Sequence, residues 1–346
     1  MNNNKSNKTL MNNNNNDGQT LMNKRETDWF RGIAALMVVL SHYGHWWNIL
    51  ASTEGNVETF RYALTKLGVY GVDIFFLFSG YAMIKSLGDK KMSWQFVWKR
   101  IKNVYIPYII IVGFIELISD GLNSLHDLWL IVCGYNYWYM MVLFLFYIGF
   151  IVIYALIRIK WLRTVIFCVF TYVMSYILYK NDMSPFWYVS NIAFAIGILA
   201  GEYEELFKKI IDKIWIYMLV ILSIGMVFVI KWGLEDGVDW GGNPEDYQIW
   251  VQIGATVVWT LLILILASKC RIKEVIFTFL GKNSLYIYIT HVFIAMRCIN
   301  FSMIDSMSVR FILSPICIIA AAFLCSLIIS CMWKLISMLT SVIKKH

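Results

Sequence analysis

Charged residues are scarce in this chain of 346 residues: they make up 15% of it, against about 25% in a typical soluble domain. Hydrophobic residues make up 59%, and the mean hydropathy is +0.62. This balance excludes an ordinary soluble protein and indicates a multi-pass membrane protein. The net charge of +8 does not indicate nucleic-acid binding, because the cations lie in short segments between apolar runs, where positive charge marks cytoplasmic loops.

The chain also lacks the cysteine patterns that hold metals. Its seven cysteines are scattered, mostly within apolar runs, with no CxxC pair and no Cys/His spacing suited to zinc. We interpret them as small packing residues and predict no metal site.

The first residues are dominated by asparagine, with Ser, Thr and Lys between them, and have little that could be buried. We therefore predict a disordered cytoplasmic tail over residues 1–28 and one membrane domain over residues 29–346.

Ten apolar segments follow the tail, each close to the ~20 residues that a helix needs to cross ~30 Å of hydrocarbon. They predict an all-α, polytopic membrane protein with about ten transmembrane helices. The third and sixth are short enough to be broken or re-entrant helices. The segments are 29–50, 69–87, 103–119, 137–157, 162–179, 186–201, 214–231, 249–267, 284–302 and 311–334.

Positive charge alternates along the loops between these segments. Lys and Arg gather before the first segment, in the second, fourth and eighth loops and at the end of the chain, whereas odd-numbered loops are neutral or acidic. The positive-inside rule then predicts an even number of spans and both termini on the cytoplasmic side. We expect a multi-pass protein of the cell inner (plasma) membrane.

The first segment contains an arginine and a histidine in apolar surroundings, within Arg31-Gly-Ile-Ala-Ala-Leu-Met-Val-Val-Leu-Ser-His42. At ~100° per residue, Arg31 and His42 share one helix face and lie about 16 Å apart along the axis. Polar groups in lipid are costly and usually face a functional interior. His45, one turn further, lies near the same face and is the rival candidate to His42.

The second segment carries a carboxylate, in Gly71-Val-Asp73-Ile-Phe-Phe-Leu-Phe-Ser79-Gly80-Tyr81. Asp73 needs a partner at this depth, which could be a cation or a hydroxyl-bearing ligand, or a structural pairing within the protein. Ser79 has no base beside it in the sequence, so helix packing is the simpler interpretation for it.

Together these two motifs resemble the acyltransferase-3 family of integral membrane acyltransferases. The basic stretch Phe96-Val-Trp-Lys99-Arg100-Ile-Lys102-Asn-Val-Tyr-Ile-Pro107 and the later stretch Leu280-Gly-Lys-Asn-Ser-Leu-Tyr-Ile-Tyr-Ile-Thr-His291 resemble two further elements of the same family. The family's basic stretch often has a second arginine where this chain has Lys102 and Asn103, and lysine lacks the bidentate fork of arginine.

The resemblance implies an O-acyltransferase, most simply an O-acetyltransferase, that moves an acyl group from acyl-CoA to a hydroxyl of a cell-surface or exported glycan. His42 would be the catalytic base, because imidazole titrates in the range that proton transfer needs. Arg31, Asp73 and His291 would share the catalytic site, although His291 could equally be a hydrogen-bonded core residue. Arg31 with Lys99, Arg100 and Lys102 would bind the donor, acetyl-CoA.

The expected partners are membrane lipid, acyl-CoA and a glycan or lipid-linked saccharide acceptor. A transporter or flippase for lipid-linked sugars is the main alternative, with the intramembrane Arg and His lining a path. The chain has no paired, Gly/Pro-broken segments in corresponding halves, which disfavours a repeat-built transporter. A sensor or scaffold for envelope synthesis would tolerate loss of His42.

Overall fold

In the computed structural model, the described residues are 20–119, 121–235, 246–272, 274–301, 303 and 306–343, apart from 51–55, and their regular elements are all helices. The all-α prediction is therefore confirmed for this part of the chain. The elements are α2 (Lys24–Leu50), α3 (Asn56–Leu87), α4 (Trp94–Arg100), the π-helix η1 (Ile101–Tyr105), α5 (Ile106–Ile118), α6 (Leu125–Cys133), α7 (Trp138–Leu156), α8 (Lys160–Lys180), the 3₁₀ turn η2 (Pro185–Trp187), α9 (Asn191–Glu202), α10 (Glu204–Glu235), α11 (Asp246–Lys269), α12 (Ile276–Lys282), α13 (Ser284–Ile299) and α14 (Met307–Ile343).

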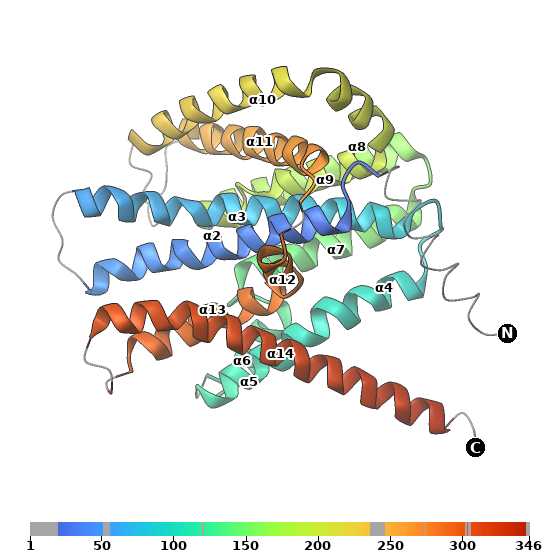
Figure 1. The fold of residues 1–346 in the computed structure, drawn as a ribbon. Coiled ribbons are helices and arrows are strands. Elements are labelled where there is room, and N and C mark those ends of the chain that lie inside the picture. Colours follow the sequence, from blue (N-terminus) through green and yellow to red (C-terminus); the bar gives the residue numbers. More distant parts are fainter. Residues whose placement is uncertain are drawn as a thin grey trace.

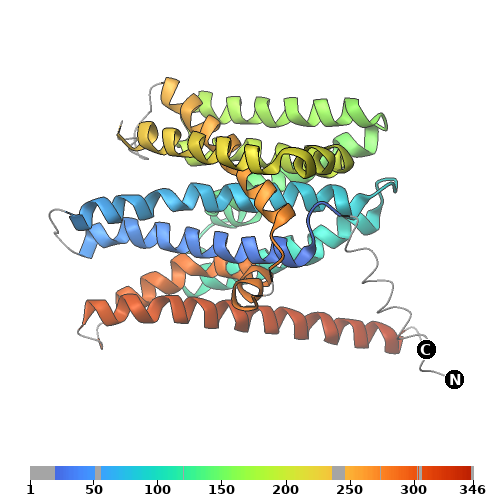
Figure 2. The same cartoon turned by 45° about the horizontal axis from the view of Figure 1, so that its top comes forward.

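Helices α2 and α3 lie side by side through the middle of the molecule (Figure 1). Helices α10 and α11 cover them on one side, and α12, α13 and α14 lie on the other (Figures 1 and 2). Helix α9 packs along α3, and the short α12 packs against α2. The two motif-bearing helices are therefore central, between layers formed by later parts of the chain.

Glycines allow the central helices to approach closely. A Cβ atom at Gly197 of α9 would lie 2.1 Å from the carbonyl oxygen of Leu77, and one at Gly80 of α3 would lie 2.3 Å from that of Phe194. Neither distance is possible for real atoms, so α3 and α9 can pack this closely only with glycine at both positions. Gly80 belongs to the second sequence motif, which thus has a packing role.

Within the described part of the chain, seven helices are long and apolar enough to cross a membrane, which supports a multi-pass membrane protein. They correspond to seven of the ten predicted spans, so the count of ten is not confirmed. Helices α9 and α13, with 12 and 16 residues, would extend only about 18 and 24 Å, less than the hydrocarbon thickness. Helix α2 has 27 residues, but charged residues occupy its first two turns.

The predicted third span is part of a longer helical run, Trp94–Ile118. The π-helix η1 interrupts this run at Ile101–Tyr105. Such π-bulges often occur at functional sites, and Asn103 of this one lines the cavity described below.

The folded part begins earlier than the predicted boundary at residue 28. Leu21 and Met22 are each only 3% exposed, and α2 already begins at Lys24. The backbone N–H of Leu21 donates to Glu204 Oε1 at 2.6 Å, which ties this segment to the start of α10. The rest of the predicted tail, residues 1–19, lies outside the described residues.

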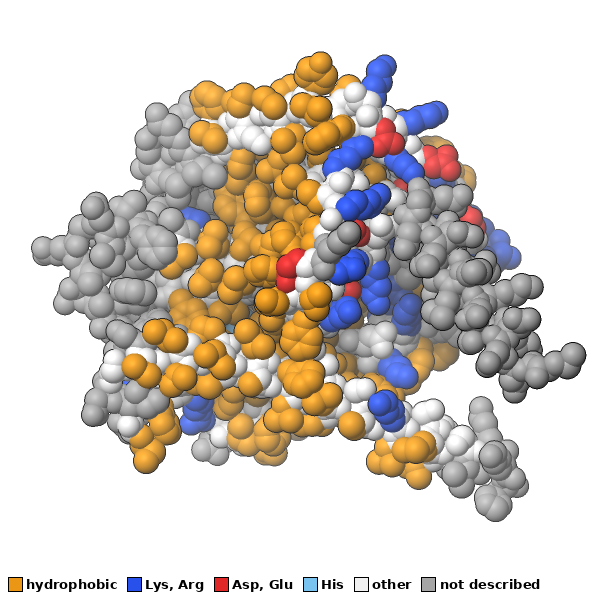
Figure 3. Space-filling view, viewed as in Figure 1, with side chains coloured by type: hydrophobic (Ala, Val, Ile, Leu, Met, Phe, Trp, Pro, Cys, Tyr) orange, Lys and Arg blue, Asp and Glu red, His pale blue; other side chains and the backbone are white. Residues whose placement is uncertain are grey.

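The surface also has the pattern of a membrane protein. Hydrophobic side chains cover the middle of the face in Figure 3, and Lys, Arg, Asp and Glu side chains gather toward one end of it. Ion pairs such as Lys85–Glu204 and Arg163–Glu202 join helices at that end. We refer to it as the charged end of the bundle.

Candidate active site

Arg31 and His42 lie in one continuous helix, α2, as the spacing predicts. Arg31 is near the charged end, where its guanidinium lies 3.8 Å from the Asp28 carboxylate one turn earlier. His42 is half-buried, whereas the rival His45 is exposed. The difference in burial favours His42 as the histidine that faces the bundle interior.

The structure brings His42 and His291 together, although they belong to helices at opposite ends of the chain. Their ring centroids are 4.7 Å apart. His291 is 3% exposed, and its Nδ1 lies 2.6 Å from the Tyr288 carbonyl oxygen. A carbonyl only accepts, so Nδ1 carries the proton and Nε2 has a lone pair. Among the described residues His291 Nε2 has no hydrogen-bond partner.

A cavity of about 420 Å³ lies between α2, α3, η1, α7, α12 and α13. Its walls combine cations, an acid, hydroxyls and aromatic rings. The lining residues are Lys24, Asp28, Arg31, Phe75, Ser79, Asn103, Val104, Tyr139, Leu143, Tyr147, Gly281, Lys282, Ser284, Leu285 and Tyr288.

Positive charge dominates the cavity wall, because its described lining residues include three cations, Lys24, Arg31 and Lys282, and one carboxylate, that of Asp28. Burial raises the pKa of Asp28, and Arg31, Lys24 and Lys282 lower it again in part. Asp28 precedes the predicted span 29–50 and so lies at the membrane edge. The excess of cations suits an anionic ligand with several phosphates.

Tyr288 connects the cavity to the histidine pair. It lines the cavity, its ring centroid is 5.6 Å from that of His291, and its ring packs against Tyr139 at 4.9 Å. A ligand that entered at the cationic wall would therefore extend toward His291 and His42.

Asp73 occupies a different place. Its side chain is fully buried, it accepts from Thr256 Oγ1 of α11 at 3.4 Å, and it is hydrogen-bonded to Ser190. Its Oδ2 has no partner among the described residues. Asp73 is not part of the cavity lining, so a catalytic role for it stays a prediction.

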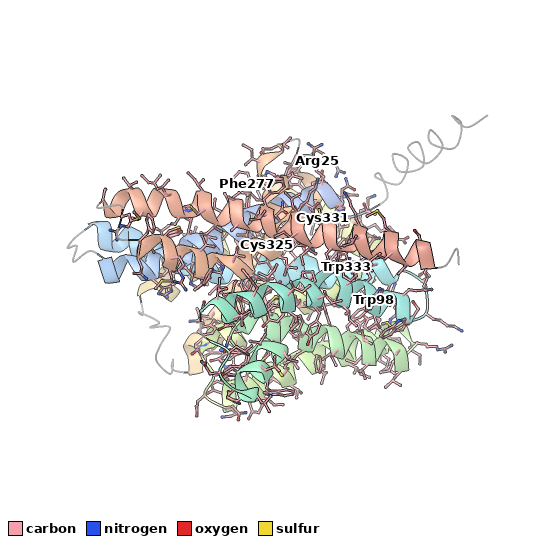
Figure 4. All side chains as sticks on the ribbon, turned by 90° about the horizontal axis from the view of Figure 1, so that it is seen from below. Arg25, Trp98, Phe277, Cys325, Cys331 and Trp333 are labelled. Atoms are coloured by element: carbon pink, nitrogen blue, oxygen red, sulfur yellow. The ribbon has the colours of Figure 1, made fainter. Side chains whose placement is uncertain are left out.

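Lys99, Arg100 and Lys102, predicted to bind the donor, are not among the cavity-lining residues of the described chain. Lys99 is exposed. Arg100 donates to Ser86 Oγ and covers the Phe96 ring at 3.8 Å. Lys102 Nζ lies 4.6 Å from the ring centroid of Trp333 on α14, the helix labelled at that residue in Figure 4. Their contribution to donor binding stays a prediction.

The sequence analysis predicted no role for several of the residues that line the cavity. Ser284 and Tyr288 lie one turn apart within the motif that ends at His291, and that spacing places them on one face. Tyr139 and Tyr147 of α7 both hydrogen-bond Ser79. Since the chain has 20 tyrosines, the sequence offers no signal that selects these two.

The arrangement can bind an anion at one end and hold a proton acceptor at the other. The lone pair on His291 Nε2, which has no hydrogen-bond partner among the described residues, gives the pair a proton acceptor.

Comparison with known proteins agrees with this chemistry. A family profile with the description "Acyltransferase domain", that of the acyltransferase-3 family, matches residues 25–332. No curated protein and no solved structure matched the chain. The matched region runs from the start of α2 into the second half of α14 and includes every residue that lines the cavity except Lys24. The chain therefore belongs to the acyltransferase-3 family of membrane acyltransferases.

Proposed function

We propose that this membrane acyltransferase is an O-acyltransferase, most simply an O-acetyltransferase, with acyl-CoA as donor and a hydroxyl of a cell-surface or exported glycan as acceptor. The observation that carries this proposal is the histidine pair beside a cationic cavity. The cavity supplies cations for phosphates. The histidines are not part of its lining, and the pair would supply a base beyond Tyr288, which lines the cavity and lies next to His291.

Donor binding follows from charge and position. Arg31 and Lys282 would hold the phosphates of CoA at the charged end, with Lys24 beside them. The thioester arm would run along Ser79 and the tyrosines of α7 toward Tyr288. This direction agrees with a donor that comes from the cytoplasm and with both termini on the cytoplasmic side of the plasma membrane.

In the transfer step, His42 takes the proton from the acceptor hydroxyl as its oxygen attacks the thioester carbonyl. The C–O bond forms, the C–S bond breaks, and the CoA sulfur leaves as a thiolate that then takes a proton. General base catalysis of this kind contributes about 10²–10⁴-fold in rate. His291, held in one tautomer by the Tyr288 carbonyl, would position His42.

The test compares wild type, a deletion, His42→Ala and the matched control His45→Ala in cells. Ester groups per sugar on the surface glycan are measured by NMR or mass spectrometry, and thiol release from acyl-CoA is measured with purified protein. We expect His42→Ala to lose at least 100-fold in thiol release while His45→Ala stays near wild type.

Other results would refute the proposal. If the deletion removed the glycan from the surface without changing the ester content per sugar, the protein would act as a transporter. If His42→Ala left ester content and thiol release intact, the histidine pair would not be the catalytic base. That result would instead agree with a sensor or scaffold, which would tolerate loss of His42.

A further inference from the structure

A second hollow lies on the side of the bundle away from the histidine pair, between α8, α9 and α11. It has a volume of about 550 Å³ and is lined mainly by apolar and tyrosine side chains. Several of its residues, including Tyr172, Tyr176 and Trp250, are 50–61% exposed. In a membrane protein these residues contact lipid, so the groove opens to the bilayer.

The groove belongs to the half of the bundle opposite the charged end. Helix α8 begins at the charged end, where Lys160 Nζ lies 5.1 Å from the ring of Tyr203. The groove follows α8 from Cys168 to its last residue, Lys180. These thirteen residues correspond to about 18 Å of helix, close to the ~15 Å depth of one leaflet. One lipid chain would therefore fit along it.

Of the described residues that line the groove, Lys180 alone is charged. Its Nζ lies 5.0 Å from the ring of Tyr179 and 5.7 Å from that of Tyr176. Among the ion pairs of the described residues, none includes Lys180. The nearest acidic residue along the chain, Asp182, is outside the lining. A cation at the mouth of an apolar groove complements an anionic lipid headgroup.

The groove wall also has a buried polar contact. Ser175, which lines the groove, accepts a hydrogen bond from Asn191 Nδ2 at 3.0 Å. Asn191 is fully buried, and its Oδ1 has no partner among the described residues. Asn191 itself is not part of the groove lining, so this contact fixes the position of Ser175 in the wall.

We infer that the α8–α9–α11 groove binds a phosphate-bearing anionic lipid of the leaflet opposite the charged end, with one chain along the groove and the phosphate at Lys180. Its location is distinct from the cavity at Arg31. If the proposed function holds, a saccharide acceptor linked to lipid through phosphate has the chemistry that this groove recognises, which would bring the acceptor to the enzyme.

The test uses purified full-length protein in nanodiscs that contain equal amounts of phosphatidylglycerol and phosphatidylcholine. Native mass spectrometry then counts the lipids that each variant retains. Wild type should retain phosphatidylglycerol in preference to phosphatidylcholine. Lys180→Gln should weaken phosphatidylglycerol binding about fivefold, the factor expected for one lysine near an anionic surface. The matched control, Lys91→Gln, removes an exposed lysine from the loop before α4 and should retain wild-type binding.

A second variant tests the groove itself. Ala195→Phe fills it from α9 and should lower retention of both lipids. Equal phosphatidylglycerol retention by Lys180→Gln and Lys91→Gln, or wild-type retention by a folded Ala195→Phe, would overturn the inference. The readout does not depend on acyl transfer: a protein that releases no thiol but still selects phosphatidylglycerol would refute the proposed function and leave the lipid site standing.

Discussion

The contact between α2 and α12 forms one wall of the cavity and offers the sharpest structural prediction. A Cβ atom at Gly281 of α12 would lie 1.6 Å from the carbonyl oxygen of Asp28, and one at Gly32 of α2 would lie 2.0 Å from that of Phe277. Each glycine thus faces the backbone of the other helix. Gly281→Ala adds a single methyl group at a place that has no room for it.

The size of the effect follows from the geometry. A carbon and a carbonyl oxygen come no closer than about 3.3 Å, so α12 must move about 1.7 Å away from α2. Inserting a methyl group into a packed interior costs about 1–3 kcal/mol. The movement also displaces Lys282 relative to Arg31 across the cavity. We expect Gly281→Ala to lower both stability and the rate of thiol release from acyl-CoA.

Gly113→Ala is the matched control. Gly113 lies within α5, and a Cβ atom there would meet nothing within 4 Å. Alanine is the better helix former, so this variant should be more stable by about 0.5–1 kcal/mol. Both proteins are purified in the same detergent and compared by thermal unfolding and thiol release. If Gly281→Ala matched Gly113→Ala in stability and turnover, α12 would not pack on α2 as the structure has it.

Three further predictions concern charges. Lys282→Gln should raise KM for acyl-CoA about tenfold, the value of one charge-assisted hydrogen bond, with kcat unchanged. The control Lys91→Gln removes an exposed lysine that does not line the cavity, and it should leave both constants unchanged in the same assay. Burial raises the pKa of Asp28, so its carboxylate becomes neutral as pH falls through that pKa, and KM for acyl-CoA should fall. Asp28→Asn should keep this KM low across the pH range. If the variant kept the wild-type pH profile, Asp28 would not be the group that controls KM. Glu204 accepts from the Leu21 N–H, so Glu204→Ala should cost about 1–3 kcal/mol and speed tryptic cleavage near residue 24, and unchanged cleavage would rule out this tether.

The interior positions of α2 and α3 could be predicted from the sequence, because both helices carry polar or charged side chains within apolar runs. A cation and an imidazole in an apolar run must face an interior, and eleven residues bring Arg31 and His42 to one helix face. Loop charges likewise marked the segments between helices. The count of spans was harder, because α9 and α13 are mostly apolar but shorter than the bilayer. Hydropathy along the sequence does not show where a helix ends.

The cavity wall was largely beyond sequence reasoning. Cations were expected from the stretch at Lys99, which is rich in charge, but charge density along the chain does not determine which side chains face a shared space. Lys282 faces the cavity because Gly281 brings α12 onto α2, a contact between residues far apart in the chain. Its position depends on packing that no local pattern encodes.

The same packing explains why the histidine pair could be proposed only as two separate residues. His291 lies on α13, which follows α12 directly, so the close approach of Gly281 to Asp28 also sets how α13 lies against α2. With that contact in place, the His42 and His291 rings come within 4.7 Å of one another. The glycine before Lys282 therefore helps to shape the candidate active site by its position, although it carries no reactive group. For this reason Gly281→Ala is expected to impair turnover as well as stability.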